Sequence, residues 1–278
     1  MSRKKRKRNQ EKRSPETVLR DWRVDRLERD RELPVPAPGP SEVTLLCYFV
    51  KPAAAAAEAF PALECAVRET WRHCGFLRTV FVADRDVPEI RAFAEPFGPW
   101  VELQVEPSLD PARPATVHRD ANSRLASRFR TPRVLIVRED AFPVRPGLGS
   151  FLDDWDFVGA PITGGGLLSS LVHALFNTHV MDGGFSLRSR RLCEAACAEW
   201  NARHGAKPWR ADWAENLFRT KYLPRVSMAY RSAMRFPVPW EALRFSWNGA
   251  SQFRGSVPPF GFSGAKAFKW LLDSGKVS

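Results

Sequence analysis

Short apolar runs alternate with longer mixed segments between residues 43 and 137. Four runs have the length of strands, at residues 43–50, 79–83, 101–105 and 133–137. The segments between them predict helices at residues 53–73, 88–97 and 119–130, with an interruption of the first at Pro61. Strands without a polar face, separated by helices, are typical of a parallel sheet that is covered on both sides. The pattern therefore predicts an α/β fold with a mostly parallel sheet flanked by helices.

The second half of the chain is richer in glycine, proline and tryptophan and is less regular. Three consecutive glycines at residues 164–166 predict a flexible loop. A short strand is expected at residues 181–187, and helices are expected at residues 190–204 and 212–221. Aromatic and proline-rich loops complete the chain.

The chain before residue 41 has a different character. Residues 14–32 place opposite charges at helical spacing, with Ser14 as a cap and Pro15 in the first turn, and predict a charged helix. This helix either docks weakly or stands free. Four prolines within residues 34–40 predict a stiff linker. We therefore expect a basic extension over residues 1–40, partly disordered or helical, and one domain over residues 41–278.

Positive charge is concentrated at the N-terminus. Eight of the first 13 residues are Lys or Arg and one is Glu, so they carry more than half of the formal net charge of +12. Such a tail can bind nucleic acid by neutralising phosphates. It can equally bind an anionic membrane surface or act as a localisation signal. The sequence does not separate these alternatives, and a protein that acts mainly through residues 1–13 is one reading of the chain.

Composition also bears on the compartment. No apolar run reaches the roughly 18 residues that span a bilayer, and no apolar segment follows the basic start as a secretory signal requires. Five cysteines without a CxxC pair are typical of free thiols in a reducing compartment. We expect a cytoplasmic protein, either free or peripheral at the inner membrane surface.

The strand ends select the first candidates for chemistry, because ligands of parallel α/β sheets bind at the carboxyl ends of the strands. That rule selects residues 49–51, Asp84, Glu139 and Asp140. Two adjacent carboxylates can hold a hard divalent cation, which would neutralise a substrate diphosphate. The alternative is an ordinary acidic loop in which Arg138 is the ion-pair partner.

Three other positions have both a functional and a structural interpretation. Two glycines beside Asp182 allow a backbone to approach a ligand closely, or they make a simple turn. Glu215 could act as a general base near the start of a short helix, or stabilise that helix through its charge. Arg124 could contact a phosphate, or lie solvated on the surface.

Six segments occur in a specific order: RVLIVREDAFPV, WDFVGAPI, MDGGFSLRSRRL, WAENLF, RFSW and PPFGFSG. Together they resemble a family of unknown function that is placed among glycosyltransferases of the GT-A fold. The resemblance covers about residues 43–265, and FVGAPI followed by GGFSLRSR is its most specific part. It implies a GT-A-like domain that moves a sugar, as hexosyltransferases do, from a nucleotide-sugar donor to a glycan or another hydroxyl acceptor. It also implies assistance by Mn²⁺ or Mg²⁺.

The resemblance further implies a role for each matching residue. Asp140 would face the metal and the diphosphate. From their positions alone, we expect Glu139 to assist Asp140 with the cation and Arg124 to contact phosphate. Phe49, Val50 and Asp84 would lie around the nucleobase and ribose of the donor. Asp182, Gly183 and Gly184 would line the site of the sugar and the acceptor, and Glu215 would be the catalytic base.

Three residues depart from the family pattern. Asn216 stands where an aspartate is usual, and an amide cannot act as a base. Ser263 replaces a histidine that could help to bind the metal. Asp182 replaces an asparagine and adds negative charge near the diphosphate. These departures favour an alternative, a catalytically impaired domain that binds a sugar nucleotide or a glycan.

Overall fold

A computed structural model of the chain describes residues 13–30, 34, 36–161, 181–204, 234–237, 239–249 and 256–277. At residues 181–183, 203, 204 and 239 it describes the backbone alone. The expectations for residues 1–12, for the glycine loop at 164–166 and for the helix at 212–221, which includes Glu215 and Asn216, lie outside the described residues. Within these ranges, no helix combines the length and the apolar character needed to cross a membrane.

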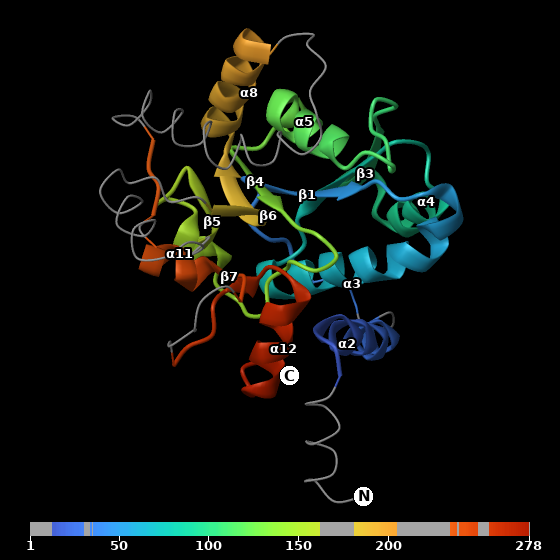
Figure 1. Cartoon of the computed structure of the whole chain (residues 1–278), viewed down its shortest axis with the longest axis vertical. Coiled ribbons are helices and arrows are strands. Elements are labelled where there is room, and N and C mark those ends of the chain that lie inside the picture. Colours follow the sequence, from blue (N-terminus) through green and yellow to red (C-terminus); the bar gives the residue numbers. More distant parts are fainter. Residues whose placement is uncertain are drawn as a thin grey trace, which may run out of the picture.

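Six strands form one mixed sheet in the order β3-β2-β1-β4-β6-β5 (Figure 1). Strands β1 (Val43–Phe49), β2 (Arg78–Ala83), β3 (Val101–Val105) and β4 (Arg133–Ile136) run parallel to one another. Strand β6 (Met181–Ser189) is antiparallel to both of its neighbours, β4 and β5 (Phe157–Pro161). The predicted α/β fold with a mostly parallel sheet is confirmed.

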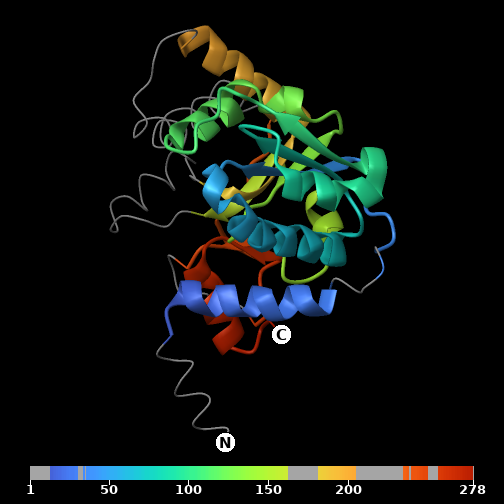
Figure 2. The ribbon, with the colours of Figure 1, turned by 90° about the vertical axis from the view of Figure 1, so that its right-hand side faces the viewer.

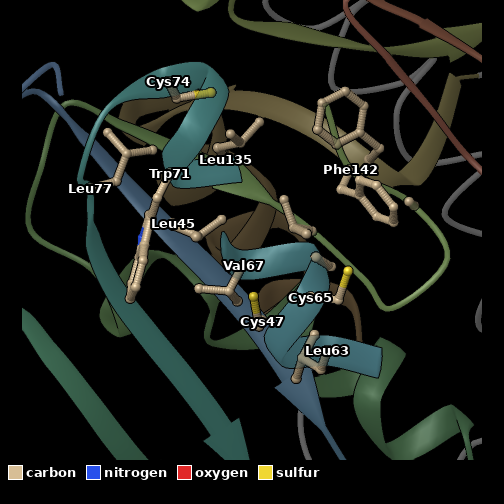
Figure 3. Close-up of a cluster of buried hydrophobic side chains, with 14 of the residues drawn as sticks. Leu45, Cys47, Leu63, Cys65, Val67, Trp71, Cys74, Leu77, Leu135 and Phe142 are labelled. Atoms are coloured by element: carbon tan, nitrogen blue, oxygen red, sulfur yellow. The ribbon is translucent and has the colours of Figure 1, made fainter. Parts of the chain in front are cut away.

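Helices cover both faces of the sheet, which explains why its strands lack a polar face. Along β1, Leu45 and Cys47 face α3 (Ala56–Cys74) and α4 (Pro88–Ala94), as Figure 3 shows for the contacts with α3. Leu46 and Tyr48 face the opposite layer, which consists of α5 (Ala115–Ser123), α6 (Leu125–Arg128) and α8 (Arg190–His204) (Figure 1). The period of two along the strand therefore feeds two separate hydrophobic clusters.

Three predicted helices differ from the observed ones. Pro61 does not interrupt α3, which continues past it to Cys74. The hydrogen bond that Pro61 cannot donate would reach the carbonyl of residue 57, in the first turn of the helix, so that only one bond near the helix start is lost. The helix predicted at 119–130 is instead two helices, α5 and α6, that meet at Arg124 with φ −136° and ψ −2°. In addition, α4 ends at Ala94 and a 3-10 helix (Glu95–Trp100) follows it.

The charged N-terminal helix α2 (Pro15–Asp30) packs against α3 and the C-terminal helix α12 (Ala265–Asp273) (Figure 2). Its apolar side chains Leu19, Trp22 and Leu27 belong to the same hydrophobic core as β1. The sequence left open whether this helix docks, and the structure shows that it does. The division of the chain at residue 40 stays a prediction.

The C-terminal part adds a small second sheet beside the first. Strand β7 (Ser246–Trp247) follows α11 (Pro239–Phe245) and pairs in parallel with β8 (Gly261–Phe262). Gly261 also forms an isolated bridge with Pro143, which lies a few residues beyond β4. This bridge brings the segment around residue 262 close to the carboxyl end of β4.

All five cysteine side chains are buried free thiols. Burial raises the pKa of Cys65 and of Cys193 to about 12, so both are uncharged near neutral pH. Cys193 and Cys197, one turn apart on α8, pack in the same cluster as Leu46. They are core residues.

Candidate functional site

The candidate site lies where the growth of the sheet changes direction. The chain adds β2 and β3 on one side of β1 and then places β4 on the other side, so the border of β1 and β4 is a switch point. Lys51 follows β1 and Glu139 follows β4, and Lys51 Nζ donates a hydrogen bond to Glu139 Oε1 at 2.8 Å. Two segments that the strand-end rule selected separately are therefore in contact at the switch point.

Glu139 and Asp140 occupy the two central positions of a tight turn. Arg138 and Ala141 exchange two backbone hydrogen bonds, of 3.0 and 3.1 Å. The backbone N–H of Gly264, just before α12, donates to the carbonyl of Asp140 at 2.7 Å. The turn at residues 138–141, hereafter the acidic turn, is thus held by its own backbone and by the C-terminal segment.

Each carboxylate of the acidic turn is paired with a cation. Burial raises the pKa of Glu139, but the hydrogen bond and the charge of Lys51 outweigh burial, and the net pKa lies below its ordinary value. The Asp140 carboxylate pairs with the Arg138 guanidinium, with Nη2 and Oδ1 2.9 Å apart. Glu139 is therefore an ionised group with its charge compensated by Lys51, and Asp140 has a cation beside it.

Asp84 and Arg85 extend the site to the carboxyl end of β2. Arg85 donates one hydrogen bond to Asp84 Oδ2 at 2.6 Å and another to the backbone carbonyl of Lys51 at 2.8 Å. The other carboxylate oxygen, Asp84 Oδ1, is buried and has no hydrogen-bond partner among the described residues. Because a buried acceptor without a partner costs about 1–3 kcal/mol, this oxygen is a place where a ligand donor would be stabilising.

The glycine pair lies at the same edge of the sheet. Strand β6 continues past its last pair with β4, Ile136 with Ser186, so its residues 182–185 lie beyond the end of β4. Opposite β5, Ser186 pairs with Gly159 and Asp182 with Ala160, so residues 183–185 bulge out of register. Gly183 and Gly184 are in this bulge, next to the level at which the acidic turn begins.

Ser263, which replaces the family's histidine, lies beside the acidic turn. Its backbone N–H donates to the carbonyl of Trp247 at 3.0 Å, and the next residue, Gly264, holds Asp140. Its side chain is buried. Ser263 therefore lies next to Asp140, the residue to which the family pattern assigns the metal.

Other predicted residues are not brought to this cluster. Phe49 is 2% exposed and packs edge-to-face on Phe60, with ring centroids 5.9 Å apart, so its ring is part of the core. Val50 is half-buried against the opposite hydrophobic cluster. Arg124 pairs with Glu106 at 2.5 Å, beyond the end of β3. The roles of these residues, of Asp182 and of Glu215 stay predictions.

Sequence reasoning missed two arginines of the site. Arg85 directly follows Asp84, so the strand-end rule could have found it. Arg23 of α2 donates a hydrogen bond to the backbone carbonyl of Glu139, 116 residues away in the sequence. An arginine within a helix of mixed charge carries no local signal of such a contact.

The residues that the structure describes do not form a complete site for a divalent cation. Glu139 and Asp140 are each paired with a basic side chain. Among the residues that the structure describes, no three His, Cys, Asp or Glu side chains gather in a group that could hold a metal ion. Four cationic side chains (Arg23, Lys51, Arg85 and Arg138) instead accompany the three carboxylates (Asp84, Glu139 and Asp140). A surplus of cations at the carboxyl ends of the strands suits an anionic ligand.

Comparison with known protein families shows the family to which the chain belongs. A family described as "Protein of unknown function (DUF5672)" matches residues 121–262, and the chain belongs to this family. No curated protein sequence matches the chain. The resemblance that the motifs suggested is confirmed at the level of the family.

Several solved structures are similar to the fold at low identity. The galactosyltransferase LgtC, in complex with donor and acceptor sugar analogs, is 12% identical, with 84% of this chain and 96% of that chain covered and a TM-score of 0.39. The mannosyltransferase PcManGT from Pyrobaculum calidifontis, in complex with GDP-Man and Mn²⁺, is 15% identical, with 80% and 62% covered and a TM-score of 0.36. The mannosyltransferase Ktr4p from S. cerevisiae is 10% identical, with 78% and 72% covered and a TM-score of 0.36. At these scores the similarities carry no argument about activity.

Proposed function

We propose that this protein transfers a sugar from a nucleotide-sugar donor to a hydroxyl-type acceptor, and that the donor binds at the carboxyl ends of β1, β2 and β4. The observation that carries the proposal is the buried Asp84 Oδ1, which has no hydrogen-bond partner in the described part of the chain, beside a cluster of cationic side chains. A nucleoside diphosphate offers both complements, because it combines hydroxyl or N–H donors with an anionic diphosphate. The motif order of the family adds the expectation of sugar transfer.

Donor binding follows from the charges around the switch point. Asp84 Oδ1 would accept a hydrogen bond from a ribose hydroxyl or a base N–H. Lys51 and Arg85 would face the diphosphate, because guanidinium and ammonium groups bind phosphate oxygens through charge-assisted hydrogen bonds. The glycine bulge at residues 183 and 184 would leave room for the sugar. Glu215 is retained as the proposed base towards the acceptor.

The proposal does not route any step through a divalent cation. Both carboxylates of the acidic turn already have cationic partners, and Mn²⁺ or Mg²⁺ would have to displace Lys51 and Arg138 to bind them. The binding experiment is therefore carried out both with and without the divalent cation.

Calorimetric titration with UDP and with GDP, each with and without Mn²⁺, tests donor binding. Wild-type protein is expected to bind one of the two nucleotides, and Asp84→Ala is expected to bind it at least about tenfold more weakly, which corresponds to roughly 1.4 kcal/mol. Asp86→Ala is the matched control, because Asp86 is exposed in the same loop and pairs only with Arg91 among the described residues. Equal affinities of Asp84→Ala and Asp86→Ala would remove Asp84 from the site. Absence of nucleotide binding by the wild type would count against the proposal as a whole.

A second function is favoured by one specific observation. Ser263 lies beside Asp140 in place of a histidine, and both carboxylates of the acidic turn are compensated by basic side chains. This arrangement suits a domain that binds a sugar nucleotide or a glycan without transferring the sugar. Release of free sugar from a panel of nucleotide sugars, followed by NMR, separates the two functions. Any sugar release that depends on the protein excludes the binding-only domain.

A further inference from the structure

We propose that Arg23 is a positioning residue, through which the N-terminal helix α2 holds the acidic turn in place for ligand binding. This inference rests on the proposed function for its consequence, but not for its structural test. The Arg23 guanidinium donates a hydrogen bond to the backbone carbonyl of Glu139. It therefore contacts the turn at the peptide between the two carboxylate residues.

The buried surroundings of Arg23 make the carbonyl of Glu139 its main polar partner. Burial lowers the pKa of Arg23, and the negative charges of Glu139 and Asp140 partly oppose that effect. The Nε atom of the same guanidinium is buried and has no hydrogen-bond partner among the described residues. A guanidinium stays charged in proteins, and removing a buried charge from water is costly unless it is hydrogen-bonded. The hydrogen bond from Arg23 to the acidic turn therefore stabilises the buried guanidinium, and breaking it in the folded protein would cost free energy.

The residue next to Arg23 fixes the helix against the same segment. Trp22 stacks on Phe142, with ring centroids 6.0 Å apart and an angle of 18° between the planes. Phe142 lies two residues beyond Asp140. Trp22 also packs on Phe268 of α12, with centroids 4.9 Å apart. Consecutive residues of α2 thus contact both the acidic turn and the core segment that follows it.

The C-terminal half of α2 is fixed to α3 by ion pairs. Arg26 Nε lies 2.7 Å from Glu69 Oε1, and Arg72 pairs with Asp30. Glu69 and Asp30 are both nearly fully buried. A helix held at its middle and along its C-terminal half can carry Arg23 as a fixed point and not as a mobile side chain.

Helix α2 also supports the turn from its second side. It packs against α12 (Figure 2), and Gly264, directly before α12, donates the hydrogen bond that holds the Asp140 carbonyl. The carbonyls of Glu139 and Asp140 are therefore held by Arg23 and by Gly264 respectively. Loss of Arg23 would release the first of these two supports, and with it the alignment of Glu139 towards Lys51.

Hydrogen exchange measured residue by residue tests the positioning role without any ligand. The backbone N–H of Ala141 bonds within the turn and that of Gly264 bonds to Asp140, so both report on the turn. Arg23→Met keeps an apolar stem but removes the donor, and exchange at these two amides is expected to rise at least tenfold. Arg23→Lys, which keeps a cationic donor, is expected to restore slow exchange at least in part. Arg20→Ala is the matched control, since Arg20 lies on the same helix and its side chain is 72% exposed.

The nucleotide affinity of the same variants tests the consequence. Arg23→Met is expected to bind UDP or GDP at least tenfold more weakly than Arg20→Ala, with a melting temperature close to that of the wild type. If the wild type binds no nucleotide, the proposed function fails, while the exchange data still decide the positioning role. Wild-type exchange at Ala141 and Gly264 in folded Arg23→Met overturns the inference. If Arg23→Met does not fold, Arg23→Leu, which likewise has no donor, decides by the same criterion.

Discussion

Gly261 lies directly against the ring of Phe185, so closely that a Cβ atom at residue 261 would stand 2.2 Å from Phe185 Cε1. The added Cβ atom would also stand 2.8 Å from the carbonyl oxygen of Phe142. Two separate motifs of the sequence, GGFSLRSR and PPFGFSG, therefore meet in space. Phe185 is fully buried and stacks on Phe245, with centroids 4.9 Å apart, so its ring cannot easily move away.

Replacing Gly261 with alanine should destabilise the fold. The added methyl group would have to displace a packed aromatic ring and a backbone carbonyl, and overpacking of this kind costs about 1–3 kcal/mol. Denaturant unfolding of Gly261→Ala measures the loss. Gly149→Ala is the control, because a Cβ at that exposed glycine meets no atom within 4 Å among the described residues. Equal stability of the two variants would contradict the packing described.

Replacing Lys51 with methionine should raise the pKa of Glu139. Burial already raises the pKa of this carboxyl, and the hydrogen bond and charge of Lys51 are the largest effects that lower it. Titration of the glutamate side-chain carboxyl signals by carbon-13 NMR follows the change. Lys269→Met, which removes a lysine paired with Asp273 on α12, should leave the Glu139 titration as in the wild type. An unchanged Glu139 pKa in Lys51→Met would show that the switch-point ion pair is weak in solution.

In the role that the family resemblance implies, Asp140 faces the donor diphosphate, so Asp140→Ala should abolish turnover of the sugar donor and leave thermal stability nearly unchanged. The atoms of the acidic turn that accept from Arg23 and Gly264 are backbone carbonyls, and the carbonyl of Asp140 that accepts from Gly264 survives the substitution. The lost carboxylate pairs with Arg138, which is about half exposed, so the ion pair contributes little to stability. Product formation and the melting temperature are the two measurements. Turnover like that of the wild type would remove Asp140 from the mechanism.

Glu106→Gln should destabilise the protein near neutral pH by about 1–2 kcal/mol, because a hydrogen-bonded charge is lost. A hydrogen bond from Ser108 and further bonds from Arg128 and Arg124 outweigh burial and lower the pKa of Glu106 from 4.5 to about 2. A depressed folded-state pKa gives stability that is present above pH 4.5 and is lost as the pH falls towards 2.

Urea unfolding between pH 7 and pH 2 follows this difference. The stabilities of the wild type and Glu106→Gln should converge as the pH falls through that window. Glu95→Gln, at an exposed position before β3, should track the wild type throughout. A difference that stays constant down to pH 2 would mean that the charge of Glu106 is not the cause.

The local pattern of apolar and polar residues was sufficient to predict most of the strands and helices. The four apolar runs became β1 to β4, and the helix predicted at 190–204 is α8 with the same bounds. Buried parallel strands can be predicted from sequence because both of their faces are apolar, and the strand-end rule then placed Lys51, Asp84, Glu139 and Asp140 at one edge. The split at Arg124 was not predicted, because a break between two short helices depends on the side chains packed around it.

What the sequence by itself determined is therefore the order of strands and helices, the edge of the sheet that carries the site, and the membership of the family. What only the tertiary structure decided is which distant residues complete that edge. Arg23 reaches Glu139, Gly264 reaches Asp140, and Gly261 makes room for Phe185, each across a long stretch of chain. The physical reason is that periodicity and strand length report on the burial of each residue within its own element. The partner of a buried polar group is fixed only when separate elements pack together.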